Sequence, residues 1–179
     1  MADYILTFTK TRFYPLEPDR EDIKIEDIAH ALSLMTRANG HFRHFYSVAQ
    51  HSIGCCREAC SRGYSKRVQL GCLLHDASES YISDLTRPVK RNLPEYFKIE
   101  DRLQKVIYHR FGLGDISDAE LLKISSVDDS LLYYEFYELM EIQLFENRPQ
   151  LSAVQDFSQR SFADVEEEFL GLFRELAEQ

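Results

Sequence analysis

The sequence predicts an all-α helical bundle, and two features of the chain lead to this fold class. Apolar residues recur at spacings of three and four through most of its length, and capping or glycine signals divide the pattern into segments of helical length. The chain has 179 residues, 44% of them hydrophobic, which is enough for one core without disulfides or a structural metal. Residues 1–179 are therefore expected to form a single domain.

A short β-hairpin is expected before the helices. The segment ILTFTKTRFYPLEP alternates apolar and polar residues briefly before it reaches Pro15 and Pro18. The first helix is expected to begin at Ile25, because apolar residues follow at spacings of three and four. It is expected to stop near Asn39 and Gly40, a pair that is typical of helix ends.

The remaining helices are expected in regular order along the chain. The segment YSVAQHSIGCCREACSRG repeats the apolar spacing and ends at Gly63, and Ser65 is a suitable N-cap for the next helix, SKRVQLGCLLHDASESY. After a loop over residues 82–94, a helix is expected to start at Pro94 and close at Gly112. The pattern then predicts one or two helices over residues 118–145 and an amphipathic helix over residues 162–179.

The charge and hydropathy of the chain restrict its partners. The net charge of −9 and the pI near 5.2 leave no broad basic surface for polymeric nucleic acid, although a few local cations can still hold a small anion. No apolar run approaches the roughly 18 residues of a membrane span. The opening MADYILTFTKTR also lacks the apolar stretch of a signal peptide. We therefore expect a cytoplasmic protein that does not bind membranes.

The four cysteines are expected to be reduced, partly buried thiols. They occupy positions 55, 56, 60 and 72 in helix-like sequence, with neither a C-x-x-C pair nor the spacing of secreted domains. Cys56 and Cys60 could share a helix face, but their spacing does not predict a zinc site.

A set of imidazoles and carboxylates indicates a candidate metal site. His75 and Asp76 end the apolar run GCLLHD, His51 lies in the apolar stretch FYSVAQHSIGCC, and Asp128 opens the aromatic run DDSLLYY. Two imidazoles and two carboxylates suit Mn, Co, Fe, Ni or Zn better than Mg. Such a cation can polarise a phosphoryl oxygen and lower the pKa of water. Glu79 would lie one turn past His75 if the helix continues, where it can transfer a proton.

These motifs resemble those of a known superfamily. The order H…HD…D is similar to the HD-domain phosphohydrolases, and HDASE followed by SDLTRPVK resembles the HDASE…GDLPTPVK stretch of bacterial HD-domain 5'-deoxynucleotidases. The segment IEDIAHALSLMTRANGHFRHFYSVAQHS is similar to a phage and prophage branch, so the resemblance covers about residues 5–145. It implies the all-α HD-domain fold, a homo-oligomer, a deoxynucleotide substrate and a metal held by His51, His75, Asp76 and Asp128.

The resemblance also implies roles for individual residues. Glu79 matches the catalytic acid or base, and Asp84 matches the carboxylate that accepts the deoxyribose 3'-hydroxyl. Arg37 lies about where the family has a phosphate-binding Arg, with Arg43 or His41 as alternatives. Asp128 is preferred to its neighbour Asp129 because the family's Asp is followed seven residues later by Glu, as Asp128 is by Glu135.

One departure from the family pattern concerns the phosphate chain. Where the deoxynucleotidases read DLPTPVK, this chain reads DLTRPVK, which introduces Thr86 and Arg87. Arg87 can bind a further phosphate through two hydrogen bonds, and Lys90 is a second candidate phosphate contact. A 5'-deoxynucleotidase is thus the first expectation, and a dNTP triphosphohydrolase, acting for example on dATP, is the alternative.

Two functions of other classes are also compatible with the sequence. A nucleotide-sensing module would keep the metal pocket without turnover, but a positioned Glu79 favours an enzyme. A helical interaction protein would have the polar cluster by chance, with the acidic surface and aromatic helices as its only support.

Overall fold

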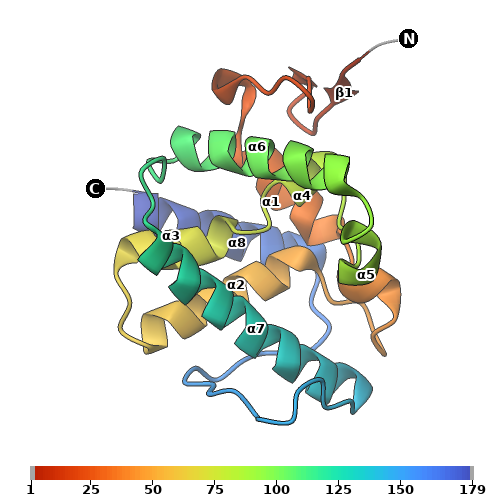
Figure 1. Ribbon diagram of the computed structural model, residues 1–179, viewed down its shortest axis with the longest axis vertical. Helices are drawn as coiled ribbons and strands as arrows, with labels where there is room; N and C mark the ends of the chain where they lie inside the picture. The colour runs from red at the N-terminus through yellow and green to blue at the C-terminus, as the bar shows by residue number, and fades with distance from the viewer. Residues whose placement is uncertain (1–2, 178–179) are drawn as a thin grey trace.

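The computed structural model describes residues 3–177 and shows a helical bundle with a small β-hairpin at one end (Figure 1). The two strands are β1 (Ile5–Leu6) and β2 (Arg12–Phe13). The helices are α1 (Ile25–Leu34), α2 (Val48–Ser61), α3 (Lys66–Leu74), α4 (Glu79–Ile82), α5 (Arg87–Lys90), α6 (Pro94–Arg110), α7 (Asp118–Met140) and α8 (Phe162–Ala177), with 3₁₀ turns at Arg20–Asp22 and Arg37–Gly40. The predicted fold class and the predicted hairpin are confirmed.

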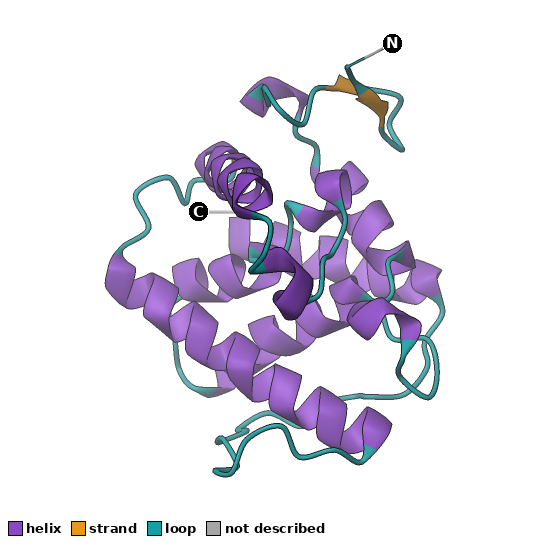
Figure 2. Cartoon of the chain, turned by 45° about the vertical axis from the view of Figure 1, so that its right-hand side comes forward, coloured by secondary structure: helices purple, strands orange, loops and turns teal. Residues whose placement is uncertain are grey.

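The hairpin contacts the helices through aromatic stacking and a buried carboxylate. Its strands are antiparallel, and they stand apart from the main body of helices in Figure 2. Phe13 is fully buried and stacks on Tyr81 of α4 with ring centroids 4.1 Å apart. Asp27 of α1 accepts hydrogen bonds from the Thr9 backbone N–H at 2.7 Å and from the Thr9 hydroxyl at 2.9 Å.

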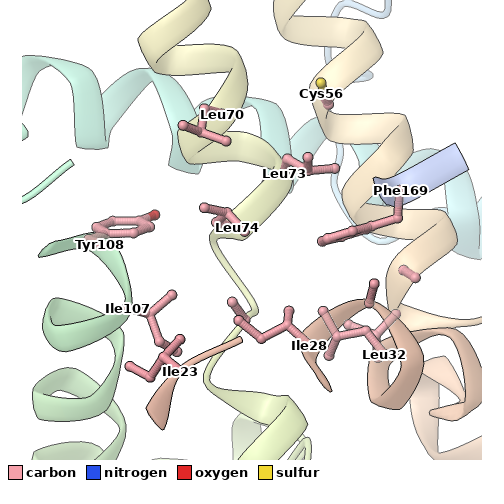
Figure 3. Packing of buried hydrophobic residues seen from close by; sticks show 14 of the residues in the cluster. Ile23, Ile28, Leu32, Cys56, Leu70, Leu73, Leu74, Ile107, Tyr108 and Phe169 are labelled. Atoms are coloured by element: carbon pink, nitrogen blue, oxygen red, sulfur yellow. The ribbon is translucent and has the colours of Figure 1, made fainter. Parts of the chain in front are cut away.

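The largest hydrophobic cluster lies around α3. Figure 3 shows Leu73 and Leu74 of α3 pointing toward side chains that come from other helices. Ile28 comes from α1, Ile107 from α6 and Phe169 from α8, and all of these side chains are fully buried. Because α8 also packs against α1 and α2, this last helix closes the core that the earlier helices leave open.

A second cluster joins α2, α3 and α7, which pack against one another. Its buried members include Cys55, Cys72, Val127 and Leu131. At Gly71 of α3, an added Cβ would lie 2.5 Å from the end of the Ile124 side chain, so a larger residue there would require this side chain to shift. Helices α2, α3 and α7 are in close mutual contact.

The segment between α7 and α8, residues 141–161, lies along α2. The buried carboxylate of Glu58 accepts hydrogen bonds from the backbone N–H groups of Ser152 at 2.9 Å and Ala153 at 2.8 Å, and it pairs with Arg62 at 2.7 Å. Gln50 donates to the Ser158 carbonyl at 3.1 Å. The segment is therefore anchored although it has no regular secondary structure.

Several predicted helix boundaries are confirmed by their caps. Ser47 and Ser65 accept hydrogen bonds from the first turns of α2 and α3, and Gly63 and Gly112 have positive φ after α2 and α6. The pattern over residues 118–145 forms one helix, which ends at Met140.

The predicted end of the first helix is wrong. Helix α1 ends at Leu34, and Thr36 instead forms an isolated antiparallel bridge with Ser47. The following turn has left-handed backbone at Ala38 and Asn39, both with φ of 50°. The Asn39-Gly40 signal therefore marks a tight turn and not a helix end, because the backbone pairs across the chain before reaching it.

The helix expected to run from Ser65 past Glu79 is interrupted. Helix α3 ends at Leu74 and α4 begins at Glu79, with tight turns between them in which the Ala77 N–H donates to Leu74 and the Glu79 N–H donates to Asp76.

Within residues 3–177, none of the helices combines the length and apolar character needed to cross a membrane.

Candidate metal centre

Four side chains from three separated parts of the sequence converge at one point. His51 lies on α2, His75 and Asp76 directly follow α3, and Asp128 lies on α7. His51 Nε2 is 3.1 Å from both His75 Nε2 and Asp128 Oδ1. Asp76 Oδ2 is 3.3 Å from His75 Nε2 and 3.8 Å from His51 Nε2. The structure therefore brings together all four residues that the sequence indicates as ligands.

The hydrogen bonds of the two histidines fix which ring nitrogen carries a proton. His51 Nδ1 is 2.6 Å from the Glu135 carboxylate, and His75 Nδ1 is 2.7 Å from the Cys72 carbonyl oxygen. Both partners are acceptors, so each Nδ1 must donate. In the neutral rings, the two Nε2 lone pairs then face each other across 3.1 Å. Such an arrangement requires a cation or an added proton between the rings.

The spacing of the four atoms suits the coordination shell of a divalent cation. Ligand nitrogen and oxygen atoms lie about 2.0–2.2 Å from such an ion, so neighbouring ligands are about 3.0–3.5 Å apart. Three of the separations here are 3.1, 3.1 and 3.3 Å, and His75 Nε2 and Asp128 Oδ1 are 3.7 Å apart. The residues present can therefore accommodate one ion with small adjustments of the side chains.

Electrostatics at this point favour protons or a cation. Burial lowers the pKa of His51 and of His75, but the surrounding anionic groups outweigh it and raise both pKa values above 6.5. Burial would raise the pKa of Asp128, yet hydrogen bonds with the two histidines hold this pKa well below 3.8. An incoming cation must displace the protons that the imidazoles hold.

Arg37 and Glu135 are two charged residues that contact the candidate ligands. Glu135 is fully buried, and its second oxygen lies 3.4 Å from the Arg37 guanidinium. Arg37 also lies 3.4 Å from Asp76 Oδ2 and 3.2 Å from His51 Nδ1. Since Glu135 orients His51 and Arg37 balances the carboxylates, both residues hold the ligand set in place.

A cavity of about 490 Å³ opens beside the four ligands. The sequence-predicted residues on its wall are Arg37, Asp76, Glu79, Asp84, Arg87, Lys90 and Asp128. Its apolar wall includes Phe42, Leu132, Phe136, Leu144 and Phe145. The alternatives to Arg37, His41 and Arg43, are exposed and do not line this cavity. The volume is within the range of about 300–1,000 Å³ that is usual for small-molecule sites.

Glu79 is a buried carboxylate with an unused oxygen. It is 4% exposed, and its Oε2 has no hydrogen-bond partner among the described residues. Burial raises the pKa of Glu79 well above 4.5, and the nearby carboxylates of Asp76 and Asp84 raise it further, against the opposing effect of Arg37 and Lys90. A carboxyl group with a raised pKa holds its proton more tightly than usual and is suited to transfer a proton.

The two predicted phosphate contacts, which lie on α5, are engaged with carboxylates. Arg87 lies 3.3 Å from Asp128 Oδ2 and 3.2 Å from Asp129 Oδ1. Lys90 lies 2.6 Å from Glu100 and 3.9 Å from Glu79. Both cations are therefore available at the cavity, although each must share its charge with these partners.

Sequence reasoning missed several features of this site. The sequence uses Glu135 only to distinguish Asp128 from Asp129 by spacing, but in the structure Glu135 contacts His51 directly. Cys55 was expected to be an ordinary buried thiol, but its sulfur lies 3.5 Å from His51 Nε2. The spacing of four residues within one helix was the available signal for this contact.

Comparison with known proteins gives relatives without an assigned activity. No family model matches the chain. The chain is 40% identical over 113 residues to the uncharacterized protein YfdR of Escherichia coli, and this match covers 63% of the chain and 61% of the relative. It is 37% identical over 122 residues to the uncharacterized protein RCAP_rcc00048 of Rhodobacter capsulatus, over 65% of the chain and 62% of the relative. The matches thus span about three fifths of these relatives' length.

Proposed function

We propose that this protein is a metal-dependent phosphohydrolase that acts on deoxynucleotides, with the resemblance to HD-domain 5'-deoxynucleotidases as its starting point. The preferred reaction converts a deoxynucleoside monophosphate to deoxynucleoside and phosphate. The alternative is release of triphosphate from a dNTP. The same cavity would serve both reactions, which differ in the length of the phosphate chain that the cations must hold.

One observation supports this proposal more than any other. The two imidazoles and two carboxylates meet beside a cavity whose wall also contains the buried Glu79, and the Oε2 of Glu79 has no hydrogen-bond partner within residues 3–177. A helical interaction protein has no need for such an arrangement, since opposed lone pairs and a buried carboxylate oxygen without a hydrogen bond both destabilise the fold. Groups that oppose stability and line one cavity are typical of active sites.

The division of roles follows from the position of each side chain. A divalent cation held by the four ligands would supply charge stabilisation at the phosphoryl oxygens and lower the pKa of water. Glu79 would accept the proton of the attacking water and return it to the leaving oxygen. Arg37, on the cavity wall, would offset the negative charge of the phosphate.

The remaining cavity wall suits a nucleoside. Asp84 lies on the wall after Ser83, whose φ of 73° turns the chain sharply at the end of α4. A carboxylate there can accept a hydrogen bond from a sugar hydroxyl. The aromatic side chains of Phe42, Phe136 and Phe145 offer apolar surface for a base. These walls support a nucleotide as the substrate class.

The proposal is tested with a panel of dNMPs, dNDPs and dNTPs in the presence of Mn, Co or Mg, with the products separated by chromatography. We expect hydrolysis of at least one deoxynucleotide class, stronger with Mn or Co than with Mg, and loss of activity on chelation. Inorganic phosphate as product indicates the nucleotidase, and triphosphate indicates the alternative. A protein that binds the nucleotides but releases no product under any of these conditions would overturn the enzymatic proposal.

Asp84→Asn is expected to weaken recognition of the sugar of the substrate. An amide keeps the shape of the side chain but replaces an anionic acceptor by a neutral one, so the bond to a sugar hydroxyl weakens. We expect kcat/KM for the deoxy substrate to fall by about tenfold, which corresponds to about 1.4 kcal/mol. Asp101→Asn, on the exposed face of α6, is the control. Equal kcat/KM in Asp84→Asn and the unmodified protein would contradict the assignment.

A further inference from the structure

A cysteine lies among the atoms of the candidate metal centre. Cys55 follows His51 by one helical turn on α2, and its Sγ is 3.5 Å from His51 Nε2. One ligand atom each from His51, Cys55 and His75 can be chosen such that all three lie within 4.8 Å of one another. The side chain is 1% exposed, so the sulfur is held in this position by the surrounding helices.

We propose that Cys55 is a further ligand of the metal centre, and that this makes the site selective for thiophilic cations such as Zn²⁺, Co²⁺ or Fe²⁺ over Mg²⁺. The inference rests on the metal centre of the proposed function. On binding, the S–H bond breaks, a sulfur–metal bond forms and the proton passes to solvent. No oxidant or reductant is required.

The geometry agrees with a mixed nitrogen and sulfur shell. With Zn–S near 2.3 Å and Zn–N near 2.0–2.1 Å, tetrahedral ligands are separated by about 3.5 Å for sulfur to nitrogen and about 3.3 Å for nitrogen to nitrogen. The separation from Cys55 Sγ to His51 Nε2 is 3.5 Å, and the two imidazole nitrogens are 3.1 Å apart. Small rotations of these side chains are enough to place one ion in contact with all three.

The sulfur approaches the centre from the side opposite to the substrate. Cys55 packs in the apolar cluster with Cys72, Val127 and Leu131, whereas Asp76 and Asp128 lie on the cavity wall. A thiolate ligand on the core side therefore leaves the cavity side of the ion free for a phosphate.

Metal selectivity follows from the chemistry of this donor. Thiolate is a soft ligand that stabilises Zn²⁺ and Co²⁺ far more than the hard ions Mg²⁺ and Mn²⁺. A site with only imidazoles and carboxylates would accept Mn²⁺ readily. The presence or absence of sulfur in the shell is therefore measurable without a substrate.

The experiment titrates the whole protein and two variants with Co²⁺ and follows the near-ultraviolet absorption that arises from sulfur-to-cobalt charge transfer. We expect this band in the unmodified protein and its loss in Cys55→Ala and in Cys55→Ser. Cys56→Ala is the matched control, because Cys56 is the next residue of α2 and equally buried, but packs in the other core cluster. It should retain the band.

Competition binding gives a second readout. Cys55→Ala should weaken Zn²⁺ binding by about tenfold or more while leaving Mn²⁺ binding within about twofold of its original value. Circular dichroism of each variant checks that the fold is retained, and Cys55→Ser keeps the side-chain size if Cys55→Ala does not fold.

The possible outcomes separate this inference from the proposed function. If Co²⁺ binds without a sulfur band, or if Cys55→Ala binds Zn²⁺ as tightly as the unmodified protein, the inference is overturned and the hydrolase proposal stands. If the sulfur band appears but no deoxynucleotide is hydrolysed, the hydrolase proposal is overturned and Cys55 remains a ligand. If the unmodified protein binds none of these cations, both are overturned.

Discussion

Replacing Asp128 by Ala is expected to remove metal binding and to reduce turnover by about 10³ or more. Asp128 Oδ1 is the carboxylate atom nearest to His51 Nε2, at 3.1 Å, and it also faces His75 Nε2. Without it, Asp76 is the one carboxylate left in the four-residue ligand set, and the coordination shell loses a charge. Metal content after dialysis and kcat with saturating Mn²⁺ are the measurements.

Asp129→Ala is the matched control for this substitution. Asp129 is the next residue of α7 and shares the Arg87 ion pair, at 3.2 Å, but its side chain is half-exposed and contacts neither histidine. Its replacement should leave metal content unchanged and activity within about twofold, because an exposed ion pair contributes little. If the two variants lost metal equally, the preference for Asp128 over Asp129 would be wrong.

Glu79→Gln is expected to reduce turnover by about 10² or more while metal binding stays intact. Glutamine has nearly the same shape as glutamate but cannot carry a proton between water and the leaving oxygen. Glu79 lies on the cavity wall outside the four-ligand set, so its neutral replacement leaves the coordination shell as it is. Single-turnover rates and metal content are measured on the same samples. Undiminished hydrolysis would remove the proton-transfer role.

Glu79→Gln is expected to lower turnover but to raise the stability of the fold, and the size of this stabilisation depends on pH. Burial raises the pKa of Glu79 above its value in the unfolded chain, so the folded state binds this proton more tightly. The stability of the unmodified protein therefore falls as pH rises from the unfolded pKa, near 4.5, through the raised folded pKa. Glu79→Gln should melt at a higher temperature than the unmodified protein at pH 8, and the difference should disappear below about pH 4. A lower Tm for the variant at pH 8 would contradict this account.

The helical framework could be predicted from the sequence because its signals are local. Ser65 caps α3, Pro94 begins α6, and the apolar spacing of each helix is set by residues within a few turns of one another. The end of α1 could not be predicted in this way. Its early stop at Leu34 depends on Thr36 pairing with Ser47, eleven residues further along the chain.

The candidate site was predictable in its ligands but not in their surroundings. His51, His75, Asp76 and Asp128 are recognisable as residue types in an order that resembles a known family. The contact between His51 and Glu135, in contrast, joins residues 84 positions apart, and it depends on how α2 packs against α7. The aromatic wall of the cavity at Phe145 likewise depends on the path of the 141–161 segment, which has no periodic signal.

The mutual packing of α2, α3 and α7 gives the candidate ion a mechanical role besides its chemical one. Each of these helices supplies or directly precedes part of the ligand set, so a bound cation would link all three helices. An ion that binds only the folded chain stabilises it by mass action, by about 2.7 kcal/mol when its concentration is 100 times its Kd. Removal of the metal would therefore lower the free energy of unfolding as well as abolish the proposed activity.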